Sequence, residues 1–96
     1  MITSKQRSYL RGLANRIQPI FQVGKNGVEE TFLKQVKDAL RKREIVKLKV
    51  LNNSGITARE ASDILCEEIN CEGVQAIGNV VVLYKRAKEP KIELPK

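Results

Sequence analysis

The chain has 96 residues, of which 42% are hydrophobic, and its 18 Lys and Arg residues outnumber its 11 Asp and Glu residues. This length suits one domain with a modest core, and no apolar run is long enough for a membrane-spanning helix. The N-terminal segment MITSKQRSYLRG lacks the apolar region of a secretory signal, so we expect a cytosolic protein. Cys66 and Cys71 lie five positions apart without any histidine in the chain, which favours two reduced thiols over a disulfide or a zinc site.

Positive charge is concentrated in the first half of the chain. The formal net charge is +7; residues 1–49 hold 12 basic and 4 acidic side chains, and residues 50–96 hold 6 and 7. A basic half beside a near-neutral half is typical of a surface that binds a polyanion, although a merely solvated surface is the alternative. Nucleic acid is therefore the leading partner class. A membrane is disfavoured, because no segment combines a basic face with bulky interfacial aromatics.

A first amphipathic helix is predicted to begin at Ser4, as its capping residue, and to end before Pro19. Its core-facing positions recur at helical spacing and are Leu10, Leu13, Ala14 and Ile17. Residues 20–23 form a short apolar strand, which leads through a loop bounded by glycines into a second amphipathic helix. The core-facing positions of this second helix are Phe32, Leu33, Val36, Ala39 and Leu40.

The stretch EIVKLKVL predicts a second strand, because apolar residues alternate in it with Lys47 and Lys49. We expect its lysine-bearing face to be an uncovered face of the sheet. Thr57 and Glu60 have the spacing of a capping box and predict the start of a third helix. The segment GVQAIGNVVVLYKR predicts a hairpin that turns at Gly78.

The order helix, strand, helix, strand, helix, strand, strand predicts an α+β domain with a four-stranded mixed sheet packed with helices. Strand–helix–strand units give parallel neighbours, and the final hairpin adds an antiparallel strand. The domain is predicted to span residues 1–86. Residues 87–96, AKEPKIELPK, contain prolines and charges without a packing period, so we expect a flexible tail.

The loop GKNG carries the most specific chemical signal, and its four residues are candidate RNA contacts: Gly24, Lys25, Asn26 and Gly27. It leads into a helix N-terminus, where unpaired amides suit a phosphate, and glycines allow a sugar–phosphate backbone to approach closely. The spacing matches the G-x-x-G loop with which KH domains clamp nucleic-acid backbone; a plain structural turn is the alternative. Glu29 and Glu30 in the first helical turn indicate that phosphates would lie nearer Lys25 and the glycine amides.

Further candidate contacts are cations that lie off the core stripes of the first two helices, and we expect them to extend the basic face around the loop. They are Lys5, Arg7, Arg11, Lys34, Lys37 and Arg41. Whether Lys47, Lys49 and Tyr84 contact RNA is left open. Aromatic residues make up only 4% of the chain, which disfavours a base-stacking platform and favours recognition of phosphate, sugar and shape.

Two long stretches, YLRGLANRIQPIFQVGKNGVEETFLKQVKDALRKREIVKLKV and ITAREASDILCEEINCEGVQAIGNVVVLYKR, resemble the CRM domain (chloroplast RNA splicing and ribosome maturation), in particular its stand-alone bacterial YhbY-like members. The resemblance covers residues 3–86. It implies RNA binding through a KH-like loop and, for bacterial members, association with precursors of the large ribosomal subunit as an assembly factor. Family members often have histidines where this chain has Asn15 and Arg43, so no titrating role carries over.

Rival functions differ in how well they fit the residues. An enzyme is disfavoured, because no nucleophile–base pair or set of metal ligands is visible, and we expect neither a cofactor nor a metal. A DNA-binding regulator could use the basic helices, but there is no helix-turn-helix pair, and no dimer-forming apolar surface is evident, so we expect a monomer. A constitutive small basic ribosomal protein is the nearest alternative to an assembly factor.

Overall fold

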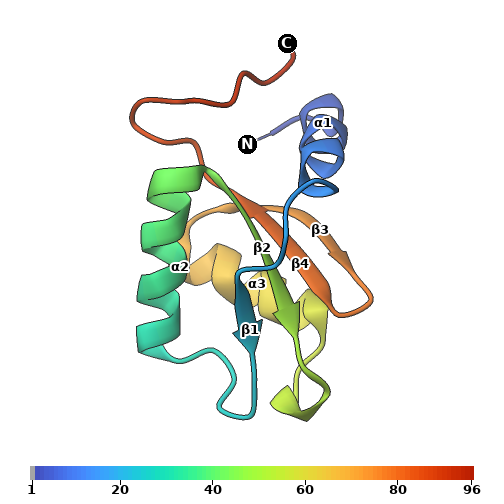
Figure 1. Ribbon diagram of the computed structural model, residues 1–96, viewed down its shortest axis with the longest axis vertical. Helices are drawn as coiled ribbons and strands as arrows, with labels where there is room; N and C mark the ends of the chain where they lie inside the picture. Colours follow the sequence, from blue (N-terminus) through green and yellow to red (C-terminus); the bar gives the residue numbers. More distant parts are fainter. Residues whose placement is uncertain (1) are drawn as a thin grey trace.

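The computed structural model describes residues 2–96, and its elements follow the predicted order of an α+β fold (Figure 1). The three helices are α1 (Ser4–Ala14), α2 (Glu30–Arg43) and α3 (Ala58–Ile69). The four strands are β1 (Phe21–Val23), β2 (Ile45–Val50), β3 (Glu72–Ile77) and β4 (Val80–Tyr84), and a short 3-10 helix spans Asn52–Ser54.

The four strands form one mixed sheet in the order β1-β2-β4-β3. β1 is parallel to β2, and β4 is antiparallel to both β2 and β3. The parallel β1–β2 pair confirms one prediction, but β2 and β3 are not the neighbours that a simple strand–helix–strand unit would give. β4 lies between them because its side chains are buried on both faces, as a central strand requires, and the tight turn at Gly78, with φ +59°, folds β4 back onto β3.

Side chains on opposite faces of the sheet belong to two separate cores. Val81 and Leu83 of β4 pack with α2 and α3 on one face, whereas Val82 and Tyr84 pack with α1 on the other. The prediction of an uncovered sheet face was therefore wrong where α1 lies. It failed because the alternation in β2 does not reveal which helix packs on it.

The helix starts depend on two capping boxes. In α1 the capping residue is Thr3, one position before the predicted Ser4: its hydroxyl accepts the Gln6 N–H, and the Gln6 side chain accepts the Thr3 N–H. In α3 the predicted pair of Thr57 and Glu60 forms the same reciprocal bonds. Both helices thus begin where local side chains satisfy the first amides.

Residues 87–96 contain no helix or strand, yet their backbone is anchored on Glu44. This residue is fully buried with φ +65°, and its carboxylate accepts the N–H groups of Ala87, Lys91 and Ile92. Ile92 and Leu94 also pack against the core beneath α1. The predicted flexibility of this segment stays a prediction, and these are the contacts that oppose it.

Candidate nucleic-acid interface

The GKNG loop joins β1 to α2 as a tight turn, in which the Gly27 N–H donates to the Gly24 carbonyl at 2.9 Å. Gly27 has φ +68°, a left-handed conformation that favours glycine. Gly24 does not, and a Cβ added there would meet only Leu51 Cδ1 at 3.9 Å, an ordinary contact. The turn therefore requires a glycine at position 27, whereas the fold does not require one at position 24.

The chemical groups of the loop point to solvent. Lys25 and Asn26 are exposed, and so are Glu29 and Glu30 where α2 begins. The capping residue Glu29 makes no side-chain hydrogen bond to the helix amides. Negative charge at this helix start opposes an anion on the helix axis. A phosphate would find its donors at Lys25 and the loop amides instead.

The cations of α2 continue from this loop along one helix face. Lys34, Lys37 and Arg41 are exposed and lie at i, i+3 and i+7, off the stripe that buries Val36 and Leu40. Arg41 is 3.8 Å from Asp38, and both side chains are more than half exposed, so this ion pair is weak. We call the GKNG loop together with Lys34, Lys37 and Arg41 the loop–α2 surface.

A second set of cations lies beside the end of α2, and these residues were not among those predicted from the sequence. Lys88 and Lys91, in the segment anchored on Glu44, line a hollow of about 360 Å³ together with Arg41 and Lys42. The acidic Glu89 also lines it. The basic residues in YKRAKEPK were the signal in the sequence. Because this segment was predicted to be a flexible tail, nothing indicated that its lysines would lie beside α2.

The three candidate cations of α1 lie apart from the loop–α2 surface. α1 covers one face of the sheet and α2 the other (Figure 1). Lys5 Nζ donates to the Lys96 carbonyl at 3.3 Å, and Arg7 Nε donates to the Gly73 carbonyl at 3.2 Å. Arg11 is exposed on the same helix. The single basic surface expected from the sequence is therefore divided between two faces.

The residues left open by the sequence differ in accessibility. Tyr84 is 3% exposed within the core beneath α1, which makes it a packing residue rather than a platform for bases. Lys47 Nζ donates to the Ala14 carbonyl at 3.2 Å and so satisfies the end of α1, whereas Lys49 is exposed. Phe21 and Phe32 meet edge to face, with ring centroids 5.8 Å apart, at the margin of the other core.

The remaining chemistry of residues 2–96 is sparse. These residues contain no group of three or more His, Cys, Asp or Glu that could hold a metal ion. Their helices are all too short or too polar to cross a membrane. Cys66 and Cys71 are free thiols whose sulfur atoms are 4.0 Å apart.

Comparison with known proteins shows which family the chain resembles. Residues 2–85 match the family model described as the CRS1 / YhbY (CRM) domain. "Probable RNA-binding protein YqeI" of Bacillus subtilis is 45% identical over 96 residues, covering 99% of this chain and 100% of that protein. An "RNA-binding protein" of Haemophilus influenzae is 34% identical over 95 residues, covering 99% and 96%.

A solved structure agrees with these matches. The solution structure of the protein SAV1595 from Staphylococcus aureus is 42% identical in sequence and superposes with a TM-score of 0.80, covering 99% of this chain and 100% of that one. The names of the two curated relatives are those of RNA-binding proteins and not of enzymes. The chain belongs to the CRS1/YhbY (CRM) domain family.

Proposed function

We propose that this chain is an RNA-binding protein that holds the RNA backbone on the loop–α2 surface. The observation that carries this proposal is the exposed Lys25 on a loop whose Gly24 the fold itself does not require. A residue without a Cβ at that position leaves room for a sugar–phosphate chain. The loop would act as the G-x-x-G loop of KH domains does, by clamping nucleotides through their backbone.

The helix extends this contact along the RNA. Lys34 and Arg41 lie seven residues apart in α2, so its cationic face is about 10 Å long at 1.5 Å per residue. Lys34 and Lys37 have no carboxylate within ion-pair distance among residues 2–96, and their charge is available to phosphates. Lys88 and Lys91 add positive charge at the far end. Backbone contacts of this kind give affinity with little sequence preference.

We further propose that the RNA is ribosomal and that the protein acts as an assembly factor on precursors of the large subunit. This role rests on the resemblance to bacterial YhbY-like proteins. Among residues 2–96 Tyr9, 43% exposed, is the one aromatic residue that is exposed, and a single ring is not a base-stacking platform, which fits a partner recognised by shape and backbone.

The first test is the salt dependence of RNA binding, measured by titrating a structured RNA at several salt concentrations. Because phosphate contacts release counterions, the logarithm of affinity should fall steeply with that of salt, by about 0.7–0.9 for each phosphate neutralised. A duplex DNA competitor should displace the RNA poorly. A flat salt response would refute a phosphate-dominated interface, and efficient displacement by DNA would favour a DNA-binding protein.

The assembly role has its own test, which is sedimentation of ribosomal particles followed by detection of the protein in each fraction. The proposal predicts that the protein travels with precursors of the large subunit and is absent from mature subunits. A constitutive ribosomal protein would instead be stoichiometric in mature particles. Absence from all ribosomal fractions would contradict both roles while leaving RNA binding itself open to the titration.

A further inference from the structure

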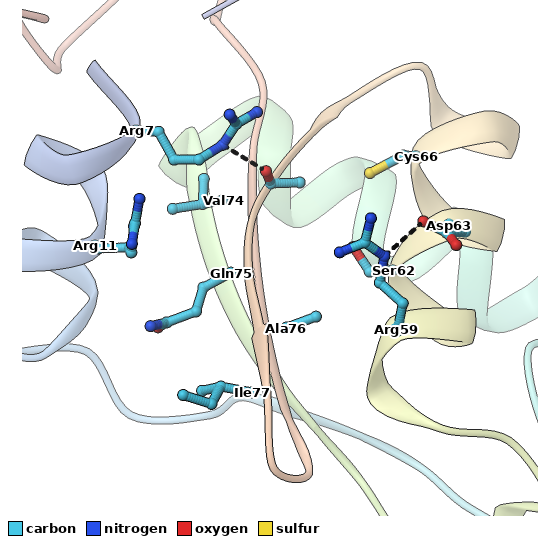
Figure 2. Close-up of a pocket in the computed structure, with 11 residues that line it drawn as sticks. Arg7, Arg11, Arg59, Ser62, Asp63, Cys66, Val74, Gln75, Ala76 and Ile77 are labelled. Carbon is cyan, nitrogen blue, oxygen red and sulfur yellow. Dashed lines mark hydrogen bonds and ion pairs between the residues drawn. The ribbon is translucent and has the colours of Figure 1, made fainter. Parts of the chain in front are cut away.

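A second concave surface runs along the outer edge of β3, between α1 and α3. It encloses about 550 Å³. Figure 2 shows Arg7 and Arg11 of α1 on one side of β3, and Arg59 of α3 on the other side. We call this surface the arginine groove. None of its three arginines belongs to the loop–α2 surface, and Arg59 was not among the residues predicted from the sequence.

The backbone of β3 forms the floor of this groove. β3 is the last strand of the sheet, so its outer edge presents peptide groups that no other strand pairs. The floor packs closely against the α3 wall of the groove: a Cβ added at Gly73 would lie 3.1 Å from Ser62 Oγ and 3.4 Å from Cys66 Sγ. Arg7 Nε donates to the Gly73 carbonyl, which fixes this arginine at one end of the groove.

The arginines of the groove are only lightly compensated. Within residues 2–96, Arg7 and Arg11 have no carboxylate at ion-pair distance. Arg59 Nε is 3.6 Å from Asp63, but the two side chains are 80% and 70% exposed, so solvent screens the pair. Because Arg7 uses Nε for Gly73, both of its terminal nitrogens remain for an anion. A planar guanidinium offers the paired donors that match a phosphate.

We infer that the arginine groove is a second RNA site, which binds the sugar–phosphate backbone of a single strand lying along β3. This inference rests on the proposed RNA-binding function and adds a surface to it at the β3 edge of the sheet. A groove walled by two helices admits one strand, whereas a duplex is recognised across its wide, shallow minor groove. Ile77, 63% exposed at the far end, offers an apolar contact to a base.

An acidic peptide is the other occupant that this charge could attract, and the strand geometry disfavours it. A peptide that adds to a sheet needs a regular row of free N–H and C=O groups. In β3 the ladder is interrupted by a register shift between Gly73 and Gln75, and the Gly73 carbonyl is already occupied by Arg7. Irregularity of this kind blunts an edge strand against further pairing. Phosphates require no such regularity.

Four charge variants test the inference against a labelled single-stranded RNA of about 12 nucleotides, within the length that one such surface contacts. Arg59→Gln removes a groove cation, and its matched control is Arg16→Gln, an exposed arginine of the same chain outside the groove. Asp63→Asn removes the groove's acid, and its control is Glu67→Gln, one turn further along α3. All four positions are exposed, so the melting temperature should not change.

The two groove variants should have opposite effects. Arg59→Gln should weaken binding of the RNA by about fivefold, because it removes a cation that contacts phosphate. Asp63→Asn should strengthen binding by about twofold, because Arg59 then has no carboxylate competing with phosphate. Each control should have a smaller effect than its partner. Equal effects of groove and control variants would mean that only net charge matters, and would overturn the inference without affecting the proposed function.

Cys66 provides a direct reporter of occupancy, because it lines the groove while Cys71 lines a different hollow. The S–H of Cys71 and the hydroxyl of Ser62 lower the pKa of Cys66 to about 7. A larger fraction of Cys66 is therefore the nucleophilic thiolate, which neutral iodoacetamide alkylates. Saturating RNA should slow alkylation of Cys66, as read by peptide mass spectrometry. The hydrogen bond to Cys66 and burial raise the pKa of Cys71, so Cys71 should stay largely unmodified with or without RNA. Protection by poly-glutamate but not by RNA would make the groove a peptide site and overturn the inference. Failure of wild-type protein to bind any RNA would refute the proposed function as well.

Discussion

The loop–α2 surface and the arginine groove are both basic, but the fold assembles them differently. The cations of the loop–α2 surface come from one continuous stretch, residues 25–41, and the helix repeat alone puts those of α2 on one side of the helix. Those of the groove come from α1 and α3, which lie more than forty positions apart in sequence and meet only at the edge of β3. A basic surface made of residues close in sequence can be predicted before the fold is known. A basic surface made of residues from distant segments cannot.

The two surfaces also differ in chemistry. The loop–α2 surface is mainly lysine, whose flexible ammonium acts as a point charge, while the groove contains only arginine among its cations, whose fork is directional. We therefore expect lysine contacts to set the overall affinity and its salt dependence. The arginine contacts would hold one strand in a defined direction.

Glu44→Ala should lower the free energy of unfolding by about 2 kcal/mol, because a buried carboxylate that accepts three backbone N–H groups is lost. The released segment should carry Lys88 and Lys91 away from α2, which weakens RNA binding at the loop–α2 surface. Urea unfolding gives the stability, and trypsin cleavage at these lysines reports the release. The control is Glu89→Ala, an exposed acid of the same segment. Unchanged stability and cleavage in Glu44→Ala would contradict the anchoring role.

The two loop glycines should respond oppositely to alanine. Gly27→Ala should cost about 1 kcal/mol of stability, because the residue has a positive φ. Gly24→Ala should leave stability unchanged, since its Cβ makes only an ordinary contact, yet it should weaken RNA binding if the backbone of RNA approaches there. Thermal unfolding and RNA titration of both variants check this pair. Normal RNA binding by Gly24→Ala would reduce the loop to a structural turn.

Much of the fold could be predicted from the sequence because its signals are local. The stripe of α2, the capping box at Thr57 and the hairpin at Gly78 each depend on residues a few positions apart, and all three are confirmed. The position of β4 between β2 and β3 could not be predicted by the same means. It depends on which strand can bury both of its faces, which only the assembled sheet decides.

In the candidate site, too, the residues with local sequence signals were predicted and those placed by distant contacts were not. Lys25 and the cations of α2 were identified by spacing alone, and all four are exposed in the structure. Arg59 was missed because nothing in its neighbourhood distinguishes it from a solvated helix residue until α3 packs beside β3. Lys88 and Lys91 were missed because the buried acceptor of their segment, Glu44, lies more than forty positions earlier.

The most direct test of the central claim is an RNA titration of Lys25→Ala at fixed salt, paired with thermal unfolding. Lysine contributes nothing to the turn, which is held by the Gly27-to-Gly24 hydrogen bond and the left-handed Gly27. Lys96→Ala, an exposed lysine remote in sequence from the loop, is the matched control. We predict that Lys25→Ala loses about 1 kcal/mol of RNA affinity, roughly fivefold, with an unchanged Tm, while the control binds normally. Wild-type affinity in Lys25→Ala would contradict the account and move the RNA away from this loop.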